Sequence, residues 1–127
     1  MIRSLDHIVL TTSDLDRCID FYTRVLGMKL ERFGQGRLAL RFGDQKINIH
    51  DKSTVAENYA AHPTAGSLDV CFLAEGPLDG VIAHLRAVGV PIELGPVKRT
   101  GARFTLRSIY LRDPDQNLIE ISEPAQA

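Results

Sequence analysis

The chain has 127 residues, 44% hydrophobic and 24% charged, which is close to the average of globular proteins. Its formal net charge of −1 gives no basic excess for binding nucleic acid or an anionic membrane. No apolar run reaches the roughly 18 residues that span a bilayer, and the N-terminal residues lack a signal-peptide pattern, so we expect a cytoplasmic protein.

The sequence of the first half of the chain predicts one helix and four strands. Residues 5–11 are β-branched and apolar with alternation, which is typical of a strand. Ser13 is expected to cap a helix with an apolar stripe from Leu15 to Leu26, and Gly27 to end it. Three short strands are then predicted between glycine-containing turns, at 28–33, 37–42 and 45–50.

The second half repeats this order after a polar linker at about 53–66. A strand at 67–73 precedes a helix that Gly76-Pro77 opens and Gly89 ends. Three further strands are predicted at 90–97, 104–112 and 117–122, with a loop at 98–103. The repeat predicts an α+β fold of two βαβββ modules in one domain, one at about 1–52 and the other at about 67–127.

Four of the predicted strands carry a polar side chain opposite their apolar face, because side chains alternate along a strand. These strands occupy corresponding positions in the two modules, the first and fourth of each. The potential metal ligands on this face are His7, His50, Asp69 and Glu120. Imidazoles and carboxylates together suit a divalent ion such as Zn²⁺, Ni²⁺, Fe²⁺ or Mn²⁺, with open positions for a substrate oxygen.

The ligand on the fourth strand has two candidates. Matching residues 47–49 to residues 119–121 selects Asn48, whereas ligand chemistry selects His50, which we prefer because an amide is a poor ligand for these ions. Asp69 has a second reading as a partner that orients a histidine. Cys18 and Cys71 lie inside apolar patterns and are expected to be buried free thiols.

Two stretches resemble the glyoxalase-like proteins of the vicinal oxygen chelate superfamily. LDHIVLTTSDLDRCIDFYTRVLGMKL is similar to the opening of these proteins, and IYLRDPDQNLIEI to their closing signature. The resemblance covers nearly the whole chain. It implies a cupped mixed sheet with the helices on the convex side and a metal on the concave face, and a homodimer whose cavities are shared between chains.

By the same resemblance, His7 matches the first metal ligand of the family and Glu120 the last. Asp69 stands where many members have a second histidine, which is a departure from the pattern. The implied activity is that of a metal-dependent lyase or isomerase, with Glu120 moving a proton on a small substrate that offers two neighbouring oxygens.

Two other functions stay open. An extradiol-type dioxygenase would use two histidines and a glutamate, and a metal-free drug-binding protein of the bleomycin-resistance type would use the cavity alone. Substrate contacts are expected from Asn48, from Arg99 and Arg103 in the basic segment around Gly101, and from Tyr110. A solvated hairpin is the alternative for the basic segment, and rim packing is the alternative for the tyrosine.

Overall fold

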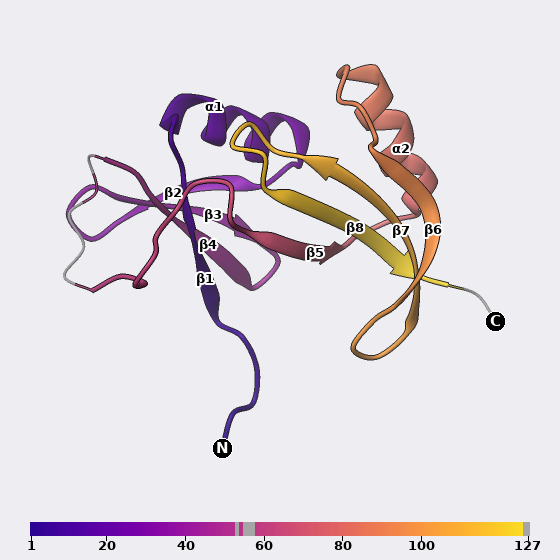
Figure 1. Ribbon diagram of the computed structural model, residues 1–127, viewed down its shortest axis with the longest axis horizontal. Coiled ribbons are helices and arrows are strands. Elements are labelled where there is room, and N and C mark those ends of the chain that lie inside the picture. Colours follow the sequence, from indigo (N-terminus) through magenta and orange to yellow (C-terminus); the bar gives the residue numbers. More distant parts are fainter. Residues whose placement is uncertain (53, 55–57, 126–127) are drawn as a thin grey trace. The chain divides into compact units, whose positions relative to one another are not determined.

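The computed structural model describes residues 1–52, 54 and 58–125, so Ser53 and residues 55–57 of the predicted linker lie outside the described residues. The chain divides into two compact units. The first contains residues 1–67 together with 114–116, and the second contains residues 68–113 and the chain from 117 onward. Each unit contains one α-helix and four strands among its described residues, and Figure 1 labels these elements. Among the described residues, no helix has the length and apolar character needed to cross a membrane.

The first unit has the order β-α-β-β-β. Its strands form one mixed sheet in the order β1-β4-β3-β2, in which β1 runs parallel to β4 and the other pairs are antiparallel. A π-helical turn, η1, continues α1 directly. The elements are β1 (His7–Thr11), α1 (Leu15–Asp20), η1 (Phe21–Val25), β2 (Lys29–Phe33), β3 (Arg37–Phe42) and β4 (Gln45–His50).

The second unit repeats this topology. Its sheet has the order β5-β8-β7-β6, with β5 parallel to β8. Its elements are β5 (Asp69–Leu73), α2 (Leu78–Ala87), β6 (Leu94–Thr100), β7 (Thr105–Arg112) and β8 (Leu118–Pro124). The predicted α+β fold with two βαβββ modules is therefore confirmed.

The core of each unit lies on one face of its sheet. In the first unit, alternation puts Leu10, Leu40 and Ile47 on the same face, and all three are at most 1% exposed. The stripe of the helical segment includes the buried side chains of Cys18 and Tyr22. In the second unit the corresponding buried side chains are Leu78, Leu85, Ile109, Leu111 and Ile119. The opposite face of each sheet is therefore left for polar side chains.

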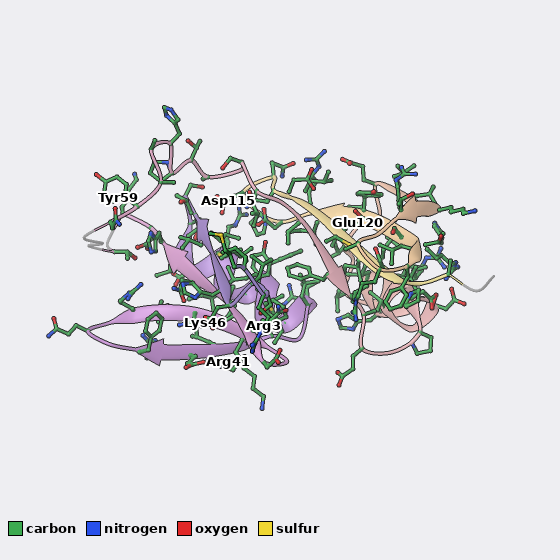
Figure 2. All side chains as sticks on the ribbon, turned by 90° about the horizontal axis from the view of Figure 1, so that it is seen from below. Arg3, Arg41, Lys46, Tyr59, Asp115 and Glu120 are labelled. Atoms are coloured by element: carbon green, nitrogen blue, oxygen red, sulfur yellow. The ribbon has the colours of Figure 1, made fainter. Side chains whose placement is uncertain are left out.

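The cap of α1 differs from the prediction. Asp14, not Ser13, is the N-cap, and its carboxylate accepts a hydrogen bond from the backbone N–H of Arg17 at 3.2 Å. The hydroxyl of Ser13 donates instead to Asp115, as does that of Thr12. Figure 2 labels Asp115. The prediction was wrong because the partner of Ser13 is more than a hundred residues away in the sequence.

The sixth strand also differs. It was predicted at 90–97 with a loop at 98–103, but β6 spans Leu94–Thr100 and pairs with β7 as far as Thr105. The basic residues Lys98 and Arg99 are therefore strand residues, opposite Arg107 and Leu106. Only a short connection around Gly101 separates the two strands.

Candidate functional site

The polar face of the first sheet is formed mainly by its two parallel strands. Register pairs His7 with Lys46 and Val9 with Asn48, and paired residues of neighbouring strands project to the same side. Asn48 is 4% exposed although it faces away from the apolar core, whereas Val9 is 44% exposed. The face therefore has a buried polar centre beside an exposed apolar residue.

His7 is exposed and is oriented by its neighbour in the sequence. Its Nδ1 lies 2.8 Å from Oδ1 of Asp6, and this hydrogen bond is the largest cause that holds the pKa of Asp6 below its ordinary value. A carboxylate on one ring nitrogen leaves the other, Nε2, available to a ligand. This is the arrangement that metal-binding histidines commonly adopt.

Two polar atoms of β4 are buried without a partner. Within the described part of the chain, no hydrogen bond reaches Oδ1 of Asn48 or Nε2 of His50. Burial, helped by the positive charge of Arg37, lowers the pKa of His50, so its imidazole is neutral near pH 7. Both atoms therefore have unused bonding capacity on the same face of one strand.

The paired strands separate His7 from His50. His7 lies opposite Lys46, whereas His50 lies opposite Thr11, four register positions farther on. Four positions correspond to roughly 13 Å along the strands, but two nitrogens bound to one ion lie within about 4 Å of each other. The register therefore argues against one ion held by both histidines, as the dioxygenase hypothesis requires.

Register also relates the two modules to each other. Asn48 pairs with Val9, and Glu120 pairs with Cys71, which occupies the same position in β5 as Val9 occupies in β1. Asn48 is therefore the positional equivalent of Glu120, and His50 corresponds to Ser122. The fourth-strand position that we assigned to His50 by ligand chemistry belongs by register to an amide.

The polar face of the second sheet is centred on Glu120. Cys71 lies beside it on β5 and Tyr110 beside it on β7. Asp69 is on the same face, two residues before Cys71, and is exposed. Among the described residues, no basic side chain forms an ion pair with the half-buried Glu120.

A chain of hydroxyl groups leads from this carboxylate into the sheet. The hydroxyl of Ser122 donates to Glu120 at 3.2 Å and lies 2.7 Å from the hydroxyl of Ser108. Both serines are fully buried. The Cys71 thiol lies 3.3 Å from the same Ser122 oxygen. Ser122 therefore joins the carboxylate, the thiol and a second hydroxyl.

Cys71 is exposed, so the prediction that it is buried was wrong; Cys18 is buried as predicted. Alternation turns residue 71 away from the apolar core. The prediction failed because it relied on the apolar neighbours of Cys71 in the sequence. Although the residue as a whole is exposed, partial desolvation of its sulfur and the charge of Glu120 raise the pKa of the Cys71 thiol, while the hydrogen bond with Ser122 opposes the rise.

The predicted substrate contacts of the second module, which are Arg99, Arg103 and Tyr110, do not all lie together. Nε of Arg99 donates to the hydroxyl of Tyr110 at 2.9 Å, which fixes that phenol beside Glu120. Arg103 instead lies in the connection between β6 and β7, with its guanidinium 4.9 Å from the ring centroid of Phe104. Arg99 and Tyr110 thus form one group, and Arg103 belongs to the hairpin end.

The resemblance noted above implies a divalent ion, which these side chains fit by chemistry. His7 offers an oriented imidazole, and Asp69 and Glu120 offer carboxylates from one face of paired strands. One imidazole with two carboxylates suits Mn²⁺ or Fe²⁺ and also Zn²⁺ or Ni²⁺. The described residues contain no close group of three histidine, cysteine, aspartate or glutamate side chains.

Comparison with known proteins agrees with this fold. The profile of the Glyoxalase/Bleomycin resistance protein/Dioxygenase superfamily matches residues 4–121. The chain is 53% identical over 121 residues to the glyoxalase domain-containing protein RDO1 of Mycosarcoma maydis, covering 95% of this chain and 68% of that protein. It is 48% identical over 123 residues to virulence protein STM3117 of Salmonella typhimurium, covering 97% of this chain and 85% of the relative.

Solved structures show the same likeness. The crystal structure of STM3117 has a TM-score of 0.95 at 47% identity, covering 98% of this chain and 99% of that one. Integron cassette protein VCH_CASS1 of V. cholerae has a TM-score of 0.94 at 47% identity, covering 98% of both chains. The chain therefore belongs to the glyoxalase/bleomycin resistance protein/dioxygenase superfamily.

Proposed function

We propose that the protein is a metal-dependent lyase or isomerase of the glyoxalase type. Its substrate is a small molecule that offers two neighbouring oxygen atoms. The observation that carries the proposal is Glu120, a half-buried carboxylate without a basic partner among the described residues. An uncompensated carboxylate on a sheet face is costly unless it binds a cation or takes part in chemistry.

The proposed donor set is His7, Asp69 and Glu120, and the bound ion would polarise the substrate oxygens. Glu120 also accepts and returns a proton as the general base of the reaction. Ser122 donates a hydrogen bond to its carboxylate at 3.2 Å. Tyr110, held by Arg99, is placed to donate a hydrogen bond to a substrate oxygen. His50 is not part of this donor set and contacts the substrate instead.

Metal binding tests the proposal directly. The protein is stripped with EDTA, reconstituted with Mn²⁺, Fe²⁺, Ni²⁺ or Zn²⁺, and assayed by elemental analysis and calorimetry. We expect one ion per site, and His7→Ala and Glu120→Gln should each weaken binding by about 10-fold or more. Glu123→Gln is the matched control, because Glu123 lies on the same strand but is paired with Arg107. Undiminished affinity in both test variants would overturn the proposal.

A metal-free binding protein is the second candidate. It is favoured by Asn48, an amide at the position where the second module has Glu120, and by the lack of a close three-ligand group among the described residues. A thermal shift with an organic ligand that EDTA leaves unchanged, together with no measurable metal affinity, would select it over the lyase.

We further propose a cytoplasmic homodimer whose cavities are shared between chains. Val9 and Leu73 support an interface or a ligand contact, because both are exposed on polar sheet faces, at 44% and 50%. Light scattering coupled to size exclusion would measure the mass, and a monomer at micromolar concentration would contradict the dimer.

A further inference from the structure

The polar face of the first unit has two buried atoms whose bonds are not used. They are Oδ1 of Asn48 and Nε2 of His50, on alternate residues of β4. Buried polar atoms almost always have a partner in folded proteins, so an orphaned pair on one face marks the place of a ligand group. The carbonyl oxygen of the amide only accepts, whereas the imidazole nitrogen accepts or donates according to its tautomer.

A cationic side chain lies next to this pair. Arg37 directly precedes the register pair formed by Leu38 and Ile49, so it is adjacent to His50 on the neighbouring strand. Its guanidinium contacts the ring of Phe33, with 4.6 Å between its central carbon and the ring centroid. Among the described residues, no carboxylate lies within ion-pair distance of Arg37.

The side chains of Lys46 and Phe33 contact each other on this face. The Nζ of Lys46 lies 3.8 Å from the centroid of the Phe33 ring, although these residues pair with positions of β3 that are four residues apart. Both side chains must therefore extend toward each other above Ala39, whose register partner is Asn48. Lys46 forms no ion pair among the described residues, so a ligand that enters here displaces the contact between Lys46 and the Phe33 ring.

We propose that this face binds a small 2-hydroxycarboxylate, with its hydroxyl between Asn48 and His50 and its carboxylate on Arg37. A hydroxyl group accepts from the Nε2–H of His50 and donates to Oδ1 of Asn48, so it satisfies both atoms at once. A guanidinium binds a carboxylate through two parallel hydrogen bonds. The exposed Val9, opposite Asn48, contacts the small alkyl group of the acid.

The chemistry of the ligand matches the spacing of the side chains. In a 2-hydroxycarboxylate the hydroxyl and the carboxylate are on adjacent carbons, and Arg37 and His50 are adjacent across two strands. A simple carboxylate would leave Asn48 Oδ1 unsatisfied, because a carboxylate donates no hydrogen. A simple diol would leave the guanidinium without its anion.

The inference rests on the proposed function only for the class of substrate, since such an acid offers two neighbouring oxygens. The binding site itself is within the first unit and requires no ion. It can therefore be tested on metal-free protein.

The experiment is a titration of the metal-free, isotope-labelled full chain, followed by NMR at the Asn48 side-chain amide and the His50 ring. The probes are L-lactate and D-lactate, with propionate and propane-1,2-diol as analogues that lack the hydroxyl or the carboxylate. We expect saturable shifts with at least one lactate enantiomer, and about 10-fold or more weaker binding of both analogues.

Two arginines on β3 provide matched variants. Arg37→Gln should weaken lactate binding by about 10-fold or more, while Arg41→Gln should change it by less than about 2-fold, because Arg41 is already paired with Glu31. Asn48→Leu, which keeps the size of the side chain, should abolish discrimination between lactate and propionate. Because Asn48 is buried, the folding of that variant is checked from its spectrum, and the exposed Arg37 variant tests the proposal independently.

Several outcomes would overturn the inference: propionate binding as tightly as lactate, equal losses in the Arg37 and Arg41 variants, or no shifts with either enantiomer. The separate metal titration distinguishes this failure from that of the proposed function. Lactate binding by a protein without metal affinity would support the 2-hydroxycarboxylate site and contradict the metal-dependent lyase. Metal binding without lactate binding would support the lyase and contradict the 2-hydroxycarboxylate site.

Discussion

Asn117 donates two hydrogen bonds to Asp113, from its backbone N–H at 2.9 Å and from its side-chain amide at 2.7 Å. The amide oxygen of the same residue accepts from the backbone N–H of Leu68 at 2.8 Å. Asn117 and Asp113 are both at least 98% buried. One side chain thus links the end of β7 to the starts of β5 and β8.

Asn117→Ala should destabilise the protein strongly. The change leaves the Asp113 carboxylate and the Leu68 N–H without their partners in a buried place, which costs about 2–4 kcal/mol in total. Urea unfolding followed by circular dichroism measures the difference. Gln45→Ala, at an exposed strand end, is the control, and a similar loss in both variants would contradict the role of Asn117.

The stability should depend on pH through Asp115. Burial acts to raise the pKa of this carboxyl, but hydrogen bonds from Ser13 and Thr12 outweigh it, so its pKa in the folded chain lies below the ordinary 3.8. The unfolded chain therefore binds the proton first as the pH falls. The stabilisation is complete above the ordinary pKa and is lost as the pH falls through the lower folded value.

Asp115→Asn should accordingly reduce the free energy of unfolding at pH 7 and have a smaller effect near pH 2. Urea titrations at several pH values give the free energy of unfolding of wild type and variant as a function of pH. Asp44→Asn, in the exposed turn between β3 and β4, should leave the pH dependence unchanged. Parallel curves for wild type and Asp115→Asn would show that the bonds to Ser13 and Thr12 do not favour the charged form.

Alkylation of Cys71 should report on the charge of Glu120. Burial and the neighbouring carboxylate raise the pKa of the thiol, so the folded protein should react with iodoacetamide more slowly than a free thiol at pH 8. Glu120→Gln should accelerate the reaction several-fold. Ser122→Ala should slow it, because the hydrogen bond with Ser122 lowers the pKa of the thiol.

Mass spectrometry follows these rates and should find one adduct, because Cys18 is 1% exposed. Glu123→Gln serves as the control of equal charge change. If it accelerates the reaction as much as Glu120→Gln does, the effect is general electrostatics and the pairing of Cys71 with Glu120 is not its cause.

Two glycines should respond to alanine in opposite directions. Gly95 has φ +110, and a Cβ there would collide with the carbonyl oxygen of Ser108, so Gly95→Ala should cost about 2–4 kcal/mol. Gly80 lies inside α2 with open space around it, so Gly80→Ala should gain roughly 0.5–1 kcal/mol. Thermal unfolding ranks the three proteins, and a melting temperature of Gly95→Ala at or above that of wild type would contradict the close approach.

The fold was predictable because its signals are local. Alternation in the strands, the apolar stripes of two helices and the turn glycines all lie within short windows, and their order repeats. The start of β6 was misplaced because residues 90–93 also alternate, and the true extent is set by pairing with β7. The cap at Asp14 was missed because Ser13 bonds to a residue distant in the sequence.

The candidate site was only partly predictable, since alternation gives the face of a side chain and not its register. His7 and His50 do share a face, but only the pairing of β1 with β4 shows that they lie at opposite ends of it. The same pairing makes Asn48 the equivalent of Glu120. Arg37 was missed although its place on β3 followed from the alternation, because nothing in one strand shows that it is adjacent to His50.

The turn at residues 114–116 belongs to the first unit although it joins two strands of the second. Asp115 closes the start of α1 by accepting the hydroxyl hydrogens of Thr12 and Ser13. During synthesis from the N-terminus, the start of α1 therefore lacks the Asp115 carboxylate as a hydrogen-bond acceptor until nearly the whole chain has emerged. A ribosome-bound fragment that stops before Asp115 would present a first module with its hydroxyl groups still solvated, and completion of the two halves would be coupled in time.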